Sequence, residues 1–187
     1  MSSLPIMLQY CIIFVISMIP IVELRGAIPI AEALNLDILW YYPIAIIGNM
    51  LPVPIIYLFA RKILVWGKDK KVIGKIFTWC LQKGEVAGKK LQNAAGKNGI
   101  FLALLLFVGI PLPGTGAWTG TLAASFLQLD FKTSVTAVML GVILAGMIMA
   151  LGSKVVSFLG WKGIAIIISF IVLLVLCSLL WKKGKKK

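Results

Sequence analysis

Histidine is absent from the 187 residues, and acidic residues and cysteines are scarce. Without an imidazole, the chain lacks the most common general base and a frequent metal ligand, so any proton chemistry must use carboxylates. The three cysteines, Cys11, Cys80 and Cys177, are scattered along the chain, which indicates neither a disulfide framework nor a metal cluster. We therefore expect no metal, no other cofactor and no enzymatic activity.

Charge is also scarce, at 13% of residues, whereas 60% are hydrophobic. A soluble domain usually has about 25% charged and about 45–50% apolar residues, so this composition indicates an integral membrane protein. The net charge of +13 does not indicate a nucleic-acid partner, because the basic residues fall between apolar blocks and form no single basic domain. We interpret them as topology signals and expect membrane lipids as partners.

Five uncharged apolar runs cover residues 4–22, 38–60, 100–127, 133–153 and 163–181. No basic stretch precedes the first run and no small-residue cleavage site follows it, so we expect it to be retained rather than removed as a signal peptide. The third run would measure about 42 Å as a straight helix, which exceeds the ~30 Å hydrocarbon core.

The third run is broken at residues 110–116, Ile-Pro-Leu-Pro-Gly-Thr-Gly, where prolines and glycines prevent a continuous helix. Each arm beside the break would be about 16 Å long, or half a bilayer, which predicts a re-entrant hairpin over residues 100–128. The N-terminal region repeats this plan. An apolar arm ends at Pro20, a broken segment carries Glu23, Arg25, Gly26 and Pro29, and a short arm follows, which predicts a first hairpin over 4–36.

Basic residues predict the topology. Ten Lys or Arg lie between residues 61 and 97, and five lysines follow residue 181, so both regions are expected in the cytoplasm. Residues 39–60, before the first basic region, and residues 133–153 and 162–181, between the two, would cross the membrane. In the loop, Val72, Ile76 and Cys80 recur at helical spacing, which predicts a basic amphipathic helix on the inner leaflet.

The predicted fold is an all-α integral membrane protein of the inner, or cytoplasmic, membrane, built as an inverted repeat of two re-entrant helical hairpins with about three full transmembrane helices. The predicted parts are a first repeat (1–60), a basic cytoplasmic linker (61–99), a second repeat (100–153) and a C-terminal transmembrane helix with a basic cytoplasmic tail (162–187).

Weak internal similarity supports a duplication. At a spacing of 93 residues, Leu-Asn-Leu-Asp at 34–37 matches Leu-Gln-Leu-Asp at 127–130, and Gly48 matches Gly141. At a spacing of 90, Gly26 matches Gly116, and one three-residue insertion would reconcile the two registers.

Glu23 and Arg25 are the most informative side chains, because ionisable residues at membrane depth are costly and mark pathways, relays or ligand sites. In an extended segment both could face one cavity, where Arg25 would bind an anionic headgroup and Glu23 would carry a proton. The alternative is a buried ion pair that only ties the hairpin. Glu32 is either a second proton carrier or a side chain that reaches the outer interface. Asp37 and Asp130 are expected to cap helices.

The second break offers backbone groups and hydroxyls but no charge, which favours a cradle for an anion or polar group over tight hairpin packing alone. Asn49 would either loosen the first crossing or hydrogen-bond a neighbouring helix. The predicted substrate-binding residues are Glu23, Arg25, Gly26, Pro111, Pro113, Gly114, Thr115, Gly116, Trp118 and Thr119.

The motif Glu-Leu-Arg-Gly-Ala-Ile-Pro at 23–29, followed by Pro-Leu-Pro-Gly-Thr-Gly-Ala-Trp-Thr-Gly at 111–120, resembles the putative small multidrug export protein family. That family is similar in plan to the DedA superfamily, whose members are inferred to have two facing re-entrant hairpins and include carriers of undecaprenyl phosphate. The chain departs from the DedA pattern because Gly109, Gly114 and Thr115 occur where that superfamily has arginines around a Phe-x-Pro motif.

These features predict a carrier, proton-coupled or facilitative, for an amphipathic substrate. A lipid phosphate such as polyprenyl phosphate is favoured over a hydrophobic drug cation. The alternatives are an ion channel, a membrane assembly factor and, least favoured, an intramembrane lipid-modifying enzyme. A homodimer would give the two hairpins more protein cover, and the sequence allows it.

Overall fold

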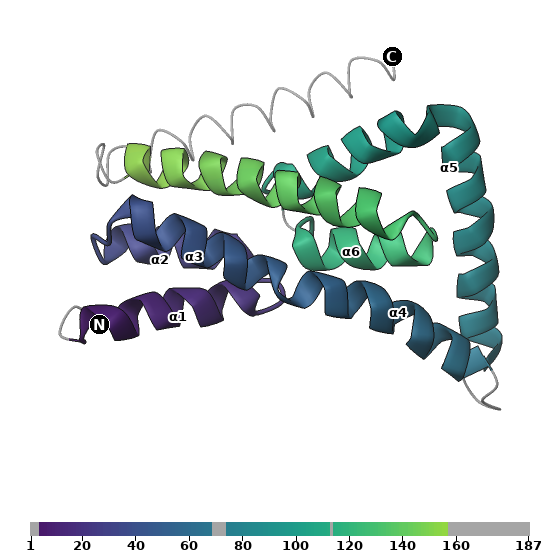
Figure 1. The fold of residues 1–187 in the computed structure, drawn as a ribbon, viewed down its shortest axis with the longest axis horizontal. Helices are drawn as coiled ribbons and strands as arrows, with labels where there is room; N and C mark the ends of the chain where they lie inside the picture. The colour runs from purple at the N-terminus through teal and green to yellow at the C-terminus, as the bar shows by residue number, and fades with distance from the viewer. Residues whose placement is uncertain (1–3, 69–73, 113, 157–187) are drawn as a thin grey trace, which may run out of the picture. The chain divides into compact units, whose positions relative to one another are not determined.

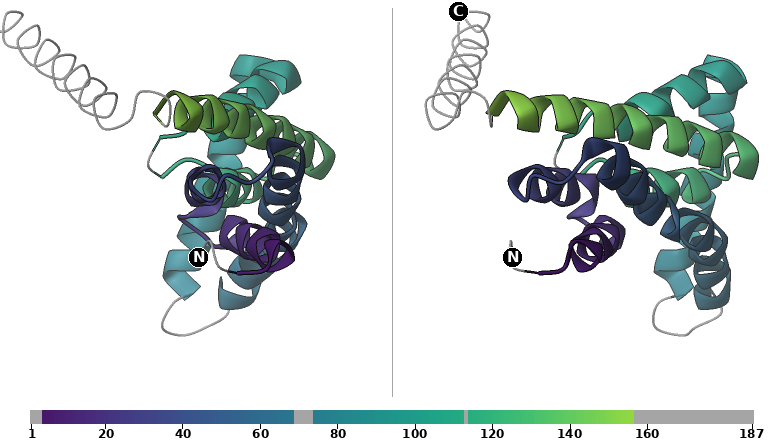
Figure 2. Two further views of the ribbon diagram at one scale, coloured as in Figure 1. Left: turned by 90° about the vertical axis from the view of Figure 1, so that its left-hand side faces the viewer. Right: turned by 60° about the vertical axis from the view of Figure 1, so that its left-hand side comes forward.

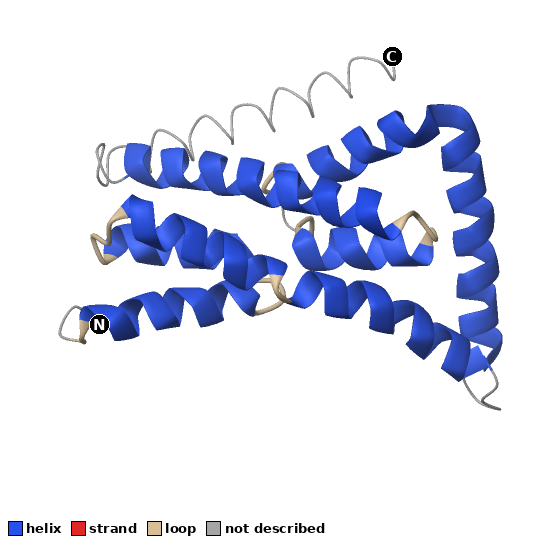
Figure 3. Ribbon diagram, viewed as in Figure 1, coloured by secondary structure: helices blue, strands red, loops and turns tan. Residues whose placement is uncertain are grey.

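The computed structural model describes residues 4–68, 74–112 and 114–156, and within these ranges the regular structure is helical throughout, without strands (Figure 3). The helices are α1 (Ile6–Met18), α2 (Glu23–Ala33), α3 (Ile38–Met50), α4 (Pro52–Lys68), α5 (Gly74–Gly109), α6 (Ala117–Phe126) and a further helix, Phe131–Val156. The predicted all-α class is confirmed for the described residues. The predicted crossing at 162–181, the basic tail and Pro113 lie outside them.

Three described stretches are long and apolar enough to cross a membrane, namely Ile38–Ala60, Gln82–Gly109 and Phe131–Val156. The first and third agree with the predicted crossings, and the chain is a membrane protein. The second is not straight, because Gly96 interrupts α5 with φ 62° and ψ −178°. The part of α5 after this kink would be only about 20 Å long, which is shorter than the ~30 Å hydrocarbon core.

Two helix–turn–helix pairs organise residues 4–130. A short break at 19–22 connects α1 to α2, and a longer break at 110–116 connects the end of α5 to α6. Figure 1 shows that the tips of the two pairs come together, with α1 and α2 on one side of the junction and α6 on the other. Helix α3 packs against α1 and α2, and α4 packs against α5 and α6. Figure 2 shows the same arrangement from two further directions.

A buried core surrounds the junction of the tips. It contains small and branched apolar side chains from both helix pairs and from the stretches Ile38–Ala60 and Phe131–Val156. Examples are Ile13, Ile28, Val108, Ala117 and Val142. Because each helix pair contributes to one continuous core, the tips are held together by packing as well as by hydrogen bonds.

The sequence prediction was wrong about the extent of the first break. Glu23, Arg25, Gly26 and Pro29 belong to α2, and the break is confined to residues 19–22. The Gly26 N–H bonds the carbonyl of Val22 at 3.1 Å, as in a regular helix. Proline and glycine were read as helix breakers, but inside a membrane protein each removes at most one helical hydrogen bond, and the packed surroundings tolerate the loss.

The same turn ends α2 and α6. Each helix is followed by a residue in the left-handed conformation, Asn35 with φ 52° and Gln128 with φ 55°. In each turn the next leucine donates its N–H to the carbonyl five residues earlier, at 3.1 Å from Leu36 and 3.0 Å from Leu129. This is the hydrogen bond that closes a Schellman cap.

Helix caps follow both turns. Asp37 Oδ1 accepts the N–H of Leu39 at 3.0 Å, and Asp130 Oδ2 accepts the N–H of Thr133 at 3.0 Å. The predicted capping roles of both aspartates are therefore confirmed. The N–H and the hydroxyl of Thr133 hold the pKa of Asp130 below its usual value.

Positive φ values recur at a spacing of 93 residues in both breaks. Ile21 and Gly114 have similar φ values of 75° and 84°, whereas Glu23 and Gly116 have positive φ values that differ, 47° and 143°. The spacing of 90, which would match Gly26 with Gly116, has no such counterpart, because Gly26 lies inside α2 whereas Gly116 precedes α6.

Candidate functional site

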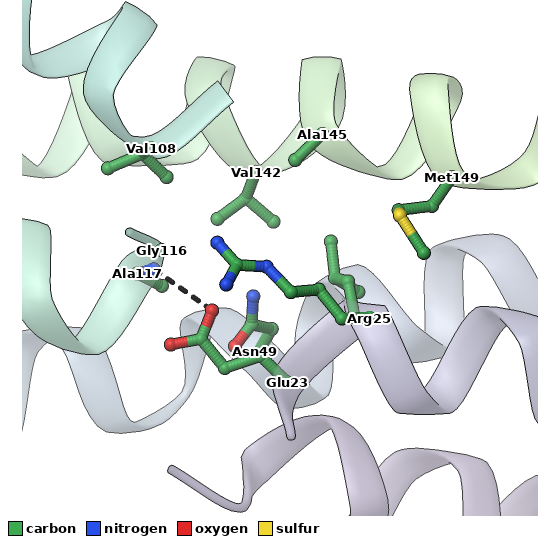
Figure 4. A pocket seen from close by; sticks show the side chains of 10 residues that line it. Glu23, Arg25, Asn49, Val108, Gly116, Ala117, Val142, Ala145 and Met149 are labelled. Atoms are coloured by element: carbon green, nitrogen blue, oxygen red, sulfur yellow. Dashed lines mark hydrogen bonds between the residues drawn. The ribbon is translucent and has the colours of Figure 1, made fainter. Parts of the chain in front are cut away.

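The first turn of α2 points Glu23 at the N-terminus of α6. Glu23 is only 6% exposed, and one of its oxygens accepts the N–H of Ala117 at 3.2 Å (Figure 4). Its other oxygen accepts the N–H of Trp118 at 3.1 Å. These N–H groups have no partner inside their own helix, and the helix dipole favours a negative charge there. Glu23 therefore occupies the cradle that sequence reasoning had assigned to a substrate anion.

Arg25 reaches into the second break. Its Nη2 donates to the Thr115 hydroxyl at 2.7 Å and to the Thr115 carbonyl oxygen. The hydroxyl of Thr115 also lies 2.8 Å from the carbonyl oxygens of Ile110 and Leu112, so this one side chain organises the turn. Both acceptors of Arg25 are uncharged, and its guanidinium is only partly buried.

The charged pair connects the two hairpins instead of forming an ion pair within one of them. Among the described residues, the salt bridge is the exposed pair Lys89–Glu85 at 2.8 Å. Glu23 and Arg25 each bind the opposite hairpin, and the indole of Trp118 adds a bond to the carbonyl of Met18 at 3.2 Å. The two charges face one region although they are two residues apart on a helix, because Glu23 begins α2 with a positive φ of 47°.

A pocket of about 440 Å³ lies beside these contacts. This volume falls within the range of about 300–1,000 Å³ that small-molecule sites usually have. The pocket is lined by Pro20, Ile21, Glu23, Arg25, Pro111, Gly114, Thr115, Trp118, Thr119 and Leu122. Ile21 is 92% exposed and has φ 75°, a strained conformation for a β-branched residue and one that clusters at functional sites.

Most predicted binding residues therefore come together, seven of them around this pocket. Gly116 lies beneath the Glu23 carboxylate and lines a smaller cavity. Gly26 lies within α2, where a Cβ would overlap the side chain of Val22, and it does not line the pocket. Pro113 lies outside the described residues.

Glu32, the second predicted proton carrier, does not line the pocket. Its carboxylate accepts the hydroxyl of Tyr41, a fully buried residue of α3. Its contact is therefore with the first crossing and not with the second hairpin.

Sequence reasoning missed Pro20, Ile21 and Leu122 as pocket residues. Ile21 and Leu122 carry no signal that separates a pocket wall from a lipid-facing or core position. Pro20 did carry one, because it precedes Pro113 by 93 residues, the spacing at which the turns after α2 and α6 match.

A family model described as "putative small multi-drug export protein" matches residues 23–148. The matched region begins at Glu23 and includes the second break, α6 and most of the last described helix. No curated protein and no solved structure matches the chain.

Proposed function

Since the chain belongs to the family of putative small multi-drug export proteins, we propose that it is a multi-pass membrane carrier for an amphipathic substrate. The observation that carries this proposal is the pocket of about 440 Å³ at the meeting point of two helical hairpins. Its polar groups gather around Arg25 and Thr115, and its remaining lining is largely apolar. A site with one polar end and apolar walls suits a substrate with a polar head and a hydrophobic tail.

In this proposal the hairpins are re-entrant, enter from opposite faces of the membrane and form an inverted repeat. Helices α1 and α2 have 13 and 11 residues, about 20 Å and about 16 Å, and neither could span a ~30 Å core alone. The conformational matches at a spacing of 93 residues support a duplication. We place the linker 61–99 in the cytoplasm and the protein in the inner membrane, in line with the clustered lysines.

The hydrogen bonds favour an anionic head over a cationic one. The charge of Glu23 is already compensated by two backbone N–H groups at a helix N-terminus. Arg25 donates to neutral oxygens of Thr115 and forms no salt bridge among the described residues, so its charge lies beside the pocket without a carboxylate in contact with it. A lipid phosphate such as a polyprenyl phosphate therefore remains the favoured substrate over a hydrophobic drug cation, with the tail against Pro20, Ile21 and Leu122.

Proton coupling follows because Glu23 and the substrate anion compete for the same backbone N–H donors. An ionised Glu23 and a substrate anion would both accept from Ala117 and Trp118. Protonation of Glu23 removes its need for these donors and frees them for the substrate. Binding of the anion and of a proton would then favour each other, as linkage between two sites requires. Glu32, bound by Tyr41 away from the pocket, is left out of this scheme.

The test is direct binding to purified protein in lipid nanodiscs, with farnesyl phosphate as the anionic probe and tetraphenylphosphonium as the cationic one. Arg25→Gln should weaken farnesyl phosphate binding by about tenfold to a hundredfold, because it removes a charge-assisted interaction. Lys132→Gln removes an equal charge at an exposed position away from the pocket and should leave the affinity unchanged.

Glu23→Gln should retain farnesyl phosphate binding and lose its dependence on pH. Tighter binding of the cationic probe, abolished by Glu23→Gln but not by Arg25→Gln, would contradict an anionic substrate. Unchanged binding of both probes by both variants would remove the site assignment. Ion flux in liposomes that needs no organic substrate would favour a channel instead.

A further inference from the structure

Glu23 and Arg25 also line a second, much smaller cavity. It measures about 10 Å³, and its other walls come from α3, α5, α6 and the helix Phe131–Val156 (Figure 4). One polar side chain from α3, Asn49, faces this cavity together with the two charged residues. The cavity has about the volume that one water molecule needs.

Asn49 is 1% exposed, and its Oδ1 has no hydrogen-bond partner among the described residues. Buried polar atoms are nearly always paired, so an unpaired one indicates an absent partner. The amide cannot easily withdraw, because the neighbouring Gly48 presses against α1. A Cβ on Gly48 would lie 2.6 Å from the carbonyl oxygen of Phe14. Helix α3 therefore holds Asn49 close to α1 and beside the cavity.

The unpaired atom is an acceptor, so its missing partner must donate a hydrogen bond. A fully deprotonated anion has no hydrogen to donate, and neither has a metal cation. Among the described residues that line the two cavities, Arg25 is the only charged group besides Glu23. Arg25 also carries donors beside the cavity, but none of its N–H groups bonds this Oδ1, and its Nη2 is held by Thr115. The donors that remain are the O–H of a protonated Glu23 and a single water molecule.

We propose that Asn49 is a positioning residue for the protonated form of Glu23, and that its Oδ1 accepts the carboxyl proton directly or through one water. This inference rests on the proposed proton-carrying role of Glu23. When ionised, Glu23 accepts from Ala117 and Trp118. When it binds a proton, one oxygen becomes a donor and needs an acceptor, which Asn49 supplies from the same cavity.

When Glu23 binds a proton, it thus exchanges a hydrogen bond with the backbone of α6 for one with Asn49 of α3. In the ionised state Glu23 ties the first hairpin to the second, and in the protonated state it ties the first hairpin to the crossing Ile38–Ala60. The N–H groups of α6 are released in the second state. Asn49 sets the pH at which the release occurs.

The test is an infrared titration of the protonated carboxyl in purified protein in nanodiscs, where Glu23→Gln identifies the band of Glu23. Asn49→Leu keeps a similar shape without an acceptor, and should move the midpoint about one pH unit lower, a tenfold smaller protonated fraction at a fixed pH. Asn49→Asp should move it in the opposite direction, because two neighbouring carboxylates share a proton.

Ser134→Ala is the matched control, because Ser134 Oγ is the other buried unpaired atom among the described residues and it lines neither cavity. Its midpoint should equal that of the wild type. An unchanged midpoint in both Asn49 variants, or shifts in the same direction in both, would overturn the proposal. So would a Glu23 band that never appears across the titration. The measurement needs no substrate, so a protein that shows both shifts and binds neither probe would keep this inference and lose the carrier function.

Discussion

Gly116 lies at the closest approach of the two hairpins. Its φ of 143° is a conformation that L residues rarely adopt, and a Cβ at this position would overlap the carboxylate of Glu23. Gly114, in the same break, also has a positive φ, 84°, but a Cβ there would contact nothing within 4 Å. Substitutions at the two glycines therefore allow the free-energy cost of backbone strain to be measured separately from the cost of displacing Glu23.

Gly116→Ala should destabilise the protein more than Gly114→Ala. The second substitution should cost about 1–2 kcal/mol from backbone strain alone. The first adds the loss of the Glu23 hydrogen bonds to Ala117 and Trp118. Its Cβ would also occupy the space beside these N–H groups, so that the substitution should weaken farnesyl phosphate binding as well. Thermal unfolding and probe binding of the two variants, side by side in nanodiscs, measure both effects. Equal losses in the two variants would show that Glu23 and Gly116 do not depend on each other.

At this scale the sequence identifies charged residues well and their partners poorly. Glu23 and Arg25 are conspicuous because charge is expensive in an apolar stretch. Their partners are backbone groups in a segment some 90 residues away, namely the N–H groups of α6 and the carbonyl oxygen of Thr115. Every residue type has such backbone groups, so the sequence does not identify them as partners. Asn49 can be identified in the sequence as a polar residue in an apolar run. The sequence does not show that it lies in the same cavity as Glu23, because this depends on how α3 packs.

The C-terminal end of α6 is held by the first half of α5. Gly84 and Gly88 lie one helical turn apart, and a Cβ on either would overlap a carbonyl oxygen, that of Phe126 or that of Leu127. Small residues at this spacing allow two helix backbones to approach closely. Since the opposite end of α6 carries the N–H groups that bind Glu23, this contact also sets the position of the site.

Gly88→Leu should destabilise the protein and weaken probe binding, although leucine is a better helix former than glycine by about 1 kcal/mol. The crowding against Leu127 outweighs this gain, because a backbone carbonyl cannot move aside without shifting α6. Gln92→Leu places the same side chain one turn later on the same helix, at an exposed position, and should be neutral or slightly stabilising. A Gly88→Leu protein as stable as the Gln92→Leu protein would contradict the contact.

Helix ends were predictable where backbone chemistry forces them. The expected arms at 100–110 and 117–127 agree closely with the end of α5 at Gly109 and with α6 at Ala117–Phe126, because prolines and glycines between them prevent a helix. The first break was placed too far along the chain because Gly26 and Pro29 look equally disruptive in sequence. The difference is tertiary: packed surroundings let α2 continue through them.

The arrangement of the whole protein in the membrane depends on one relation between the two halves. Leu39 and Lys132 lie 93 residues apart, each exposed and each in the first turn of a long span, just after the aspartates that cap the two spans. If the halves are inverted copies, these two positions must lie on opposite faces of the membrane. Lys132 is the basic member of the pair, and basic loop residues favour the cytoplasmic side.

Cysteine accessibility tests this relation, with Leu39→Cys and Lys132→Cys placed singly in a chain whose Cys11, Cys80 and Cys177 are replaced by serine. A membrane-impermeant maleimide added to intact cells should label position 39 at once and position 132 only after the membrane is permeabilised. Labelling of both positions from one side would contradict the inverted arrangement, because both spans would then begin at the same face. Labelling with the two sides exchanged would retain the inverted repeat and reverse its orientation, so that the cytoplasmic placement of the basic linker would be wrong.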